Sequence, residues 1–430
     1  MPKSSAESVA ASADSAGVVA VVETQLSSFG LMPLRVAREL GFRTAFLTND
    51  TNRYRSVPIA EEIFSRYTDA FVEADTNSVE GVERGLEGLG GLGALRSVFT
   101  ICDYNLPIVA EVAARHGLPT VAPQAAATAR NKARMREVCS AAGIPCPRFT
   151  WAKSLEDAEA AAQEVGLPCV VKPMTESASV DVALCRTLDD VRAQYAYIAE
   201  NPRDARGQPR PPGVLVEEYL VGYEVSVETV AVDGEIRVLG VTDKLLGPHP
   251  YFAEIGDTFP SGLPEESQRE AAATAVAALH AIGHDFGAAH TEVKLTADGP
   301  RLVEVNARIA GDEVTELIRL STGLSLLPEV LKMHTGEHVD LRPPEPKRAA
   351  ASRTLATPAE GRVRALHGRE LARRVPGVVD VSFKIKPGDL LYRATSNHGI
   401  VGGVLAVGAV PTEATRRAEA AFGQLSLELE

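Results

Sequence analysis

The 430-residue sequence is poor in aromatic residues, which make up 5% of the chain and include a single tryptophan. It has no apolar run near the roughly 20 residues needed to cross a bilayer, and the run GVVAVV at residues 17–22 is too short for a signal-peptide core. Basic residues are also few, because 44 Lys and Arg face 57 Asp and Glu and leave a net charge of −13. A chain of this charge repels polyanions. We therefore expect neither a membrane nor a nucleic acid as a partner.

Cysteine is equally sparse. The five cysteines are odd in number, include no CxxC pair and mostly occupy apolar contexts such as LPCVVKP. This usage is typical of reduced core cysteines in an intracellular protein and differs from that of a disulfide-rich secreted domain. The sequence therefore predicts a cytoplasmic location.

The remaining composition is that of a folded protein. Hydrophobic residues account for 45% of the chain and charged residues for 23%, close to the averages of globular domains. At roughly 150 residues per domain, the length predicts two to four domains. Residues 1–16 combine Ser and Ala without apolar periodicity, which predicts a disordered tail.

Strand and helix patterns alternate from residue 17 and predict an α/β fold, α+β in parts, that starts with a parallel sheet. A second region begins near Asn131 with the amphipathic helix KARMREVCSAAG, and the proline-rich run LRPPEPKR ends it. A β-rich segment and the helix PTEATRRAEAAFGQL follow. We expect three folded parts, over residues 17–130, 131–342 and 343–430.

The most informative stretch is HTEVKLTADGPRLVEVNAR, residues 290–308. A DGP turn lies between two alternating segments, which predicts an antiparallel hairpin. With the loop centred on the Asp of this turn, Glu292 lies opposite Glu304 and His290 opposite Asn306. The other face then points to the core and carries Thr291, Val293, Leu295, Val303 and Val305.

Directly opposed like charges destabilise a strand pair, so a cation is expected between Glu292 and Glu304. Carboxylate and amide oxygens suit Mg²⁺ or Mn²⁺, with Asn306 as a further ligand. Mg²⁺ usually keeps phosphate or water among its ligands, which makes a nucleotide its expected companion. The pairing alone leaves open the alternative of a solvated hairpin whose charges spread apart.

The order of these residues along the chain closely resembles the ATP-grasp superfamily, and particularly its L-amino-acid ligases, which make dipeptides. The resemblance rests on Lys132, on Lys172 in PCVVKP, on VEEYLVGYE at residues 216–224, and on the hairpin acids with Asn306 and Arg308. It covers about residues 17–340, and the β-rich tail is similar to the family's C-terminal domain. It implies an ATP-grasp fold with an N-terminal parallel α/β domain, a two-part ATP-binding region whose lid spans about 145–222, and a β-rich C-terminal domain.

The resemblance also implies a nucleotide site. Lys172 emerges at the end of a buried apolar strand, where a point cation suits phosphate. Lys132 lies in the first turn of a helix and, taken alone, is typical of a solvated surface lysine; the resemblance implies that it also reaches the phosphates of ATP. The strand in VEEYLVGYE bends at Gly222. By resemblance, adenine and ribose meet Glu217, Glu218, Leu220 and Glu224.

The loop after Lys172 departs from the family. ATP-grasp ligases usually carry a glycine-rich loop there, whereas this chain reads TESASVDV at residues 175–182, without glycine. Glycine reaches positive φ values at little cost, so we expect a stiffer loop. In it, the hydroxyls of Ser177 and Ser179 are expected to donate to the phosphates in place of some main-chain N–H groups.

Candidate substrate residues lie on either side of the metal ligands. Arg308 presents a planar fork that suits a substrate carboxylate or an acyl phosphate. His290 is close enough on the hairpin to be considered as the base for the attacking amine. The segment at residues 241–262 is long and irregular, and such segments tend to carry function. Its candidate contacts are Lys244, His249 and Tyr251.

The predicted activity is ATP-dependent carboxylate–amine ligation through an acyl phosphate, with release of ADP and phosphate. One rival is a carboxylase of the same superfamily that uses bicarbonate to form carboxyphosphate. Another is an ATP-binding regulatory protein with weak turnover, suggested by the glycine-free loop. The sequence leaves the oligomeric state open, although a homodimer through the first domain is common in such enzymes.

Overall fold

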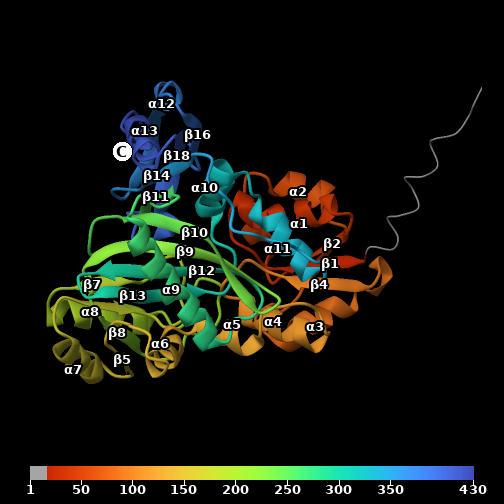
Figure 1. The fold of residues 1–430 in the computed structure, drawn as a ribbon, viewed down its shortest axis with the longest axis horizontal. Coiled ribbons are helices and arrows are strands. Elements are labelled where there is room, and N and C mark those ends of the chain that lie inside the picture. Colours follow the sequence, from red (N-terminus) through yellow and green to blue (C-terminus); the bar gives the residue numbers. More distant parts are fainter. Residues whose placement is uncertain (1–16) are drawn as a thin grey trace, which may run out of the picture.

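The computed structural model describes residues 17–430, apart from the side chain of Asp312. The predicted disordered tail, residues 1–16, lies outside the described residues. Figure 1 shows an N-terminal α/β unit beside a broad antiparallel sheet, with a small lid at one end of the molecule and the C-terminal strands at the other. These parts are those of the predicted ATP-grasp fold.

The N-terminal unit is built on a four-stranded parallel sheet in the order β3-β2-β1-β4. Every residue of the apolar run VVAVV in β1 is buried, as expected for a parallel strand covered on both faces. Its strands and helices are β1 Val18–Val22, α1 Ser28–Glu39, β2 Arg43–Thr48, α2 Ala60–Arg66, β3 Ala70–Glu73, α3 Val79–Glu87, β4 Leu95–Phe99, α4 Leu106–Arg115 and α5 Pro123–Arg130.

The lid is a four-stranded sheet in the order β5-β8-β6-β7, covered by two helices. Each helix begins with a capping box, formed by Ser154 and Asp157 in one case and by Thr187 and Asp190 in the other. Such boxes satisfy main-chain donors that a helix start leaves unpaired. Helix α6 (Lys132–Ala141) precedes the lid, which contains β5 Phe149–Ala152, α7 Leu155–Val165, β6 Cys169–Lys172, β7 Ala183–Cys185, α8 Leu188–Glu200 and β8 Val214–Glu218.

An eight-stranded antiparallel sheet forms the centre of the molecule, in the order β13-β12-β9-β10-β11-β14-β18-β16. Five of its strands come first along the chain: β9 Gly222–Val232, β10 Glu235–Leu246, β11 Glu254–Phe259, β12 Gly287–Thr296 and β13 Gly299–Asn306. The helices of the same region are α9 Glu265–Ile282, α10 Asp312–Thr322 and α11 Leu326–His334. The segment at residues 241–262, expected to be irregular, consists mainly of strands β10 and β11 joined by a short loop.

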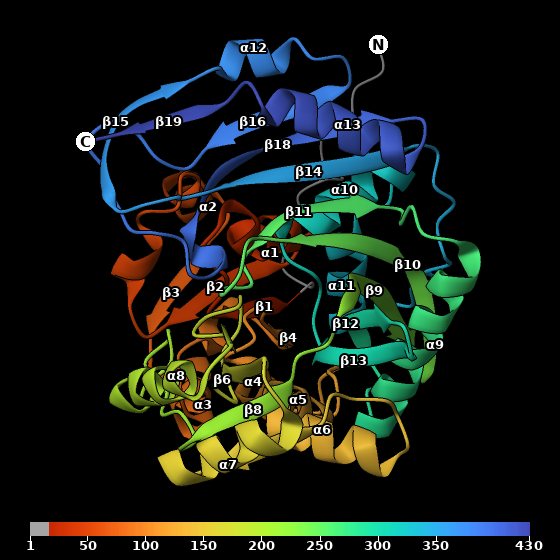
Figure 2. The same ribbon diagram turned by 90° about the vertical axis from the view of Figure 1, so that its left-hand side faces the viewer.

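The C-terminal strands continue this sheet instead of forming a separate layer. Strand β14 pairs with β11 through Thr258 and Ala351, and Figure 2 shows β14 and β18 running beside β11. A small second sheet, β17-β15-β19, completes this region. The elements are β14 Ala349–Ala356, β15 Gly361–His367, α12 Arg369–Arg373, β16 Val378–Phe383, β17 Leu390–Leu391, β18 Ile400–Gly408, α13 Pro411–Phe422 and β19 Ser426–Leu429.

The predicted hairpin is confirmed as β12 and β13, with Glu292 opposite Glu304 and His290 opposite Asn306. Towards the turn, however, the register shifts by one residue, so that Val293 faces Leu302. Leu302 is fully buried and Val303 is only half-buried. The expectation that Val303 points to the core was therefore wrong, because a bulge inserts one residue and reverses the alternation locally.

Two broader expectations can be compared with the described residues. Within residues 17–430, none of the helices combines the length and the hydrophobicity that a bilayer span requires. All five cysteines are free thiols, and four of them are buried, which agrees with the prediction of reduced core residues.

The buried His284, just after the left-handed cap Gly283 of α9, makes stability depend on pH. Burial lowers the pKa of His284 to about 4, against about 6.5 in an unfolded chain. The neutral form is favoured on folding, so its contribution is complete above pH 6.5 and is lost as pH falls towards 4.

We expect the protonation of His284 to lower the free energy of unfolding by about 2–3 kcal/mol when the pH falls from 7 to 4.5. Urea unfolding of the wild type and of His284→Asn at both pH values measures it, and the variant should show the smaller loss. His280→Asn, on the exposed side of the same helix end, is the control. An equal loss in wild type and His284→Asn would contradict the assignment.

Candidate active site

The opposed carboxylates of the hairpin are each held by a lysine from another element. Lys132, at the start of α6, donates to Glu304 at 2.9 Å and to the carbonyl of Glu176 at 2.6 Å. Lys244, on β10, donates to Glu292 and, at 2.9 Å, to Glu254. Protein ammonium groups therefore offset the repulsion between the two acids, each from its own side, whereas the expected divalent ion between them stays a prediction.

His290 lies between Glu292 and a further acid, Glu228 on β9. Its Nδ1 is 2.9 Å from Glu228 and its Nε2 is 3.4 Å from Glu292. Burial alone would lower the pKa of His290, but the Glu228 carboxylate raises it to about 10. In this arrangement the two carboxylates favour the imidazolium form of the ring, which has no free lone pair to accept a proton from an amine.

The surroundings of Glu292 contain more acids than bases. Asp257 is 3% exposed, and burial together with the neighbouring Glu254 raises its pKa well above the usual range. The Oδ1 atom of Asp257 is buried without a hydrogen-bond partner among the described residues. Burial and Glu292 likewise raise the pKa of Glu224. An excess of buried carboxylates is an environment that additional cations stabilise.

The donor set fits a hard divalent ion. Glu292 and Glu304 supply carboxylate oxygens from adjacent strands, and Asn306, 9% exposed, adds an amide on the same hairpin face. Such oxygens are the ligands that Mg²⁺ prefers. Within residues 17–430, three His, Cys, Asp or Glu side chains do not converge into a complete cluster. The remaining ligands would therefore come from a substrate or water.

Lys172 lies at the end of β6 as predicted, in a buried ion pair. Its ammonium is 2.6 Å from Glu217, which also accepts from the fully buried Arg136 at 2.8 Å. Burial would raise the pKa of Glu217, yet Arg136 and Lys172 lower it to about 2. Glu217, expected to line adenine, is placed where its side chain orients Lys172.

The other residues expected around adenine and ribose lie along the bend after β8. Glu218 pairs with the exposed Arg148, and Leu220 is half-buried. Glu224 is 3.2 Å from Lys294 on β12. The bend requires Gly222, since a Cβ there would lie 2.0 Å from the carbonyl oxygen of Leu295.

The glycine-free loop at residues 175–182 adopts a glycine-like backbone. Ala178, Ser179 and Asp181 have φ values of 56°, 58° and 57°. Aspartate tolerates this region, but alanine and serine pay roughly 1–2 kcal/mol each. The hydroxyl of Ser177 donates to Asp103 at 2.7 Å and that of Ser179 to the carbonyl of Phe252 at 2.9 Å. Both serines therefore bind protein groups, and the loop is held in a strained conformation.

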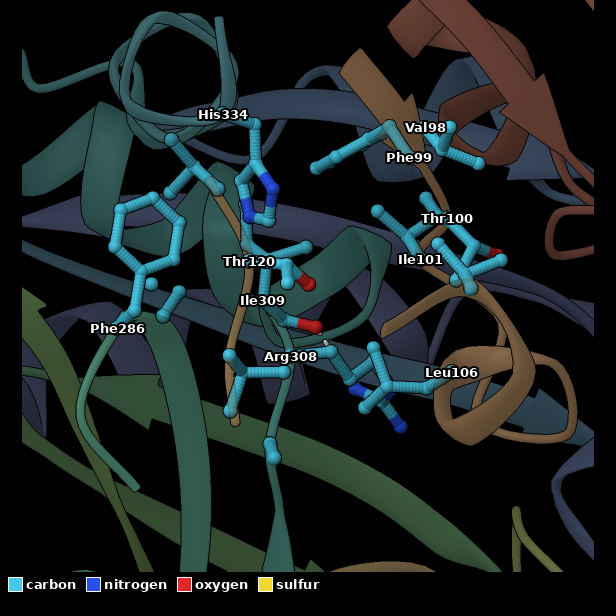
Figure 3. Close-up of a pocket in the computed structure, with 16 residues that line it drawn as sticks. Val98, Phe99, Thr100, Ile101, Leu106, Thr120, Phe286, Arg308, Ile309 and His334 are labelled. Carbon is cyan, nitrogen blue, oxygen red and sulfur yellow. Dashed lines mark hydrogen bonds between the residues drawn. The ribbon is translucent and has the colours of Figure 1, made fainter. Parts of the chain in front are cut away.

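Arg308 is anchored by the N-terminal unit. Its Nε and Nη2 donate to the two carboxylate oxygens of Asp103 at 2.6 and 2.7 Å, and its Nη1 donates to the carbonyl of Ile309. Three of the five N–H groups of a guanidinium are thus used and two remain. Figure 3 shows Arg308 at one end of a cavity of about 20 Å³, with His334 and Phe286 towards the other.

The substrate candidates on β10 and the following loop divide into two groups. Lys244 joins the carboxylates as described above. His249 is exposed and bonds instead to the hydroxyl of Tyr219 at 2.9 Å, near the bend after β8. Tyr251 is half-buried in the same loop. The structure does not bring His249 to the hairpin acids.

Two important residues escaped the sequence analysis. Asp103 ends the run SVFTICD, and side chains that follow a parallel strand meet at the carboxyl edge of the sheet, where ligands bind; this signal was present. Arg136 is one of several charged residues in an amphipathic helix, and its complete burial carries no local signal.

Comparison with known proteins identifies two domains in the chain. Residues 165–316 match the ATP-grasp domain, and residues 353–430 match the L-amino acid ligase C-terminal domain 2. The crystal structure of L-amino acid ligase from Bacillus licheniformis superposes with a TM-score of 0.79 at 21% identity, over 96% of this chain and 99% of that one. The fold is therefore the ATP-grasp fold.

Curated relatives are similar over part of their length. The uncharacterized protein y4rH of Sinorhizobium fredii is 29% identical over 77% of this chain and 68% of its own. Alanine–anticapsin ligase of Bacillus subtilis is 28% identical over 59% of this chain and 57% of its own. The match thus spans little more than half of that ligase.

These findings define a chain with an ATP-grasp domain on an ATP-grasp fold. Its C-terminal part is similar to the second C-terminal domain of L-amino acid ligases.

The Asp103–Arg308 pair provides a test of the site's construction. Both side chains are nearly buried, 12% and 11% exposed, so removing one partner leaves a desolvated charge. We expect Asp103→Ala to lower the free energy of unfolding by about 3 kcal/mol. Adding Arg308→Met should recover much of this loss, because the unpaired charge disappears with it.

Chemical unfolding of the two single variants and the double variant measures this coupling. Glu428→Ala, which breaks the exposed pair with Arg364, is the matched control and should change stability by less than about 1 kcal/mol. An Asp103→Ala effect as small as that of the control would show that the pair is not desolvated.

Proposed function

We propose that the protein is an ADP-forming carboxylate–amine ligase that joins an amino acid, or a related carboxylate, to an amine. The observation that carries this proposal is the pairing of Glu292 with Glu304 across one hairpin, with Lys132 and Arg308 beside it. Opposed carboxylates suit Mg²⁺, and the surrounding cations suit the phosphates that Mg²⁺ accompanies.

The proposed reaction has two steps. An oxygen of the substrate carboxylate attacks the γ-phosphorus of ATP, and the bond to the β-phosphate oxygen breaks to release ADP. The amine then attacks the carbonyl carbon of the acyl phosphate, loses a proton, and phosphate leaves with the electron pair of the broken C–O bond. Positioning and charge neutralisation supply most of the catalysis in phosphoryl transfer.

We assign roles to the chain's own residues on this basis. Glu292, Glu304 and Asn306 would hold two Mg²⁺ ions, which neutralise the charge on the transferred phosphoryl group. Lys132 and Lys172 bind phosphates, and the two free N–H groups of Arg308 bind the acyl phosphate. Each of these cations is now paired with an internal carboxylate, and substrate phosphates would compete for it.

Two further assignments concern the lid and the histidine. The hydroxyls of Ser177 and Ser179 donate to the phosphates of ATP once they release their present acceptors, Asp103 and the carbonyl of Phe252. His290, as an imidazolium between Glu228 and Glu292, positions the metal ligand Glu292 and leaves the amine's proton to another acceptor. The match to the L-amino acid ligase C-terminal domain supports amide formation over the carboxylase and regulatory alternatives.

The nucleotide product tests the reaction path. An acyl-phosphate route releases ADP, whereas an adenylating route releases AMP. We expect ADP and phosphate when the protein is incubated with ATP, Mg²⁺ and a matrix of paired amino acids and related carboxylates. Hydroxylamine should trap the activated acid as a hydroxamate. AMP as the sole nucleotide product would contradict the mechanism, and ADP formation that depends on bicarbonate would favour a carboxylase.

The metal assignment is tested with Glu304→Gln, which removes a ligand charge but keeps an oxygen that accepts from Lys132. We expect turnover to fall roughly 100-fold at fixed Mg²⁺, since one group that stabilises the transition state is weakened. Stability should fall, because the buried Lys132 loses the charge of its partner, and relief of the repulsion with Glu292 should offset part of this loss.

Steady-state ADP release over a Mg²⁺ titration measures the effect, and added Mg²⁺ should restore part of the rate. Glu428→Gln, an exposed acid in the C-terminal region, is the control. Near-normal turnover of Glu304→Gln at ordinary Mg²⁺ would show that the metal ligands lie elsewhere.

A further inference from the structure

A short segment of the C-terminal region reaches the glycine-free loop of the lid. The main-chain N–H of Asn397 donates to the carbonyl of Ala178 at 3.0 Å. The side-chain oxygen of Asn397 accepts from the main-chain N–H of Glu254, at the start of β11, at 2.8 Å. One residue therefore bridges the lid loop and the central sheet, although the lid helices and the C-terminal strands lie at opposite ends of the molecule (Figure 1).

The segment that carries Asn397 is itself well fixed. The carbonyl of Gly399 accepts from both the N–H and the hydroxyl of Thr357, at 3.0 and 3.2 Å. The carbonyl of Thr357 in turn accepts from the N–H of Ala394 at 2.9 Å. A Cβ on Gly399 would lie 2.4 Å from the Cβ of Ala394, so the turn is tightly packed. Asn397 is consequently presented by a rigid support.

The loop, by contrast, is in a conformation that its own sequence disfavours. Ala178 has φ 56°, a region in which alanine is strained and glycine is not. Such conformations persist when surrounding contacts impose them. The carbonyl bonded by Asn397 belongs to this strained residue. The contact is therefore placed where it can hold the loop in its present shape.

The other bond of Asn397 leads to the carboxylates. Glu254, whose main-chain N–H it accepts, pairs through its side chain with Lys244 at 2.9 Å. Lys244 also donates to Glu292. Asn397 thus contacts both the loop at residues 175–182 and the strand end that carries the ion pair of Glu254 with Lys244.

We propose that Asn397 is a positioning residue of the ligation site, and that it holds the strained loop at Ala178 in its present conformation while fixing the start of β11. A glycine would reach the positive φ of this loop without strain. In this chain, a hydrogen bond from the C-terminal region stabilises that φ at an alanine instead. The inference rests on the proposed function for its kinetic consequence, but the loop contact can be tested without activity.

The test uses Asn397→Pro, Ala178→Gly and the double variant in the full chain, because the bond to Ala178 comes from the main-chain N–H of Asn397, which alanine would keep and proline removes. Residue 397 starts a helical turn after the extended Ser396, a position that proline tolerates. Tyr392→Ala is the matched control, because Tyr392 is 65% exposed in the same region. Hydrogen exchange of the loop amides is measured for each variant, together with the kcat and KM for ADP release.

We expect Asn397→Pro to speed exchange in the loop roughly 10-fold and to lower kcat by a similar factor, with a smaller change in the KM for ATP. Ala178→Gly relieves the strain at φ 56° and should recover part of both losses in the double variant. A residue that only stabilised the C-terminal region would not be rescued by a change in the lid. Unchanged loop exchange, or additive effects without rescue, would overturn the proposal.

Two safeguards keep the outcomes separate. If Asn397→Pro fails to fold, Asn397→Ala, which keeps the main-chain N–H and loses only the acceptor of the Glu254 N–H, should still speed loop exchange, and unchanged exchange contradicts the proposal. If the wild type forms no ADP with any substrate pair, the proposed function fails. The loop-exchange measurements still decide whether Asn397 holds the loop.

Discussion

The repulsion between Glu292 and Glu304 is the constraint around which the central site is arranged. The two acids face each other on adjacent strands, where like charges are unfavourable. Cations from α6 and β10 offset this repulsion at Glu304 and Glu292. Because these elements belong to different parts of the chain, the hairpin charges tie the helix before the lid to the central sheet.

Buried charge pairs also link the other parts of the molecule to one another. Arg308 follows β13 but is anchored by Asp103 of the N-terminal unit, and Glu217 of the lid holds Lys172 against Arg136 of α6. A buried pair adds little net stability, yet losing one partner is costly. These pairs therefore specify how the parts meet, and they bring Lys132, Lys172 and Arg308, the cations proposed to bind phosphates, to the junctions between those parts.

The loop after Lys172 adopts a backbone conformation that its own residues disfavour. Without glycine, the loop still reaches positive φ at Ala178 and Ser179. The strain is sustained by neighbours, since Ser177 bonds to Asp103 and Ser179 to the carbonyl of Phe252. The stiffness expected of this loop stays a prediction, whereas the partners of its hydroxyls were decided by the surrounding parts.

The sequence by itself determined the hairpin, the facing of Glu292 and Glu304, and the strand end at Lys172, because alternation and turn chemistry are local properties. Only the tertiary structure decided the bulge at Val303 and the partners of the charged groups. Lys132 and Glu304, for example, are separated by 172 residues. No local pattern encodes such a pairing, since desolvation and packing of the whole fold select which charges meet.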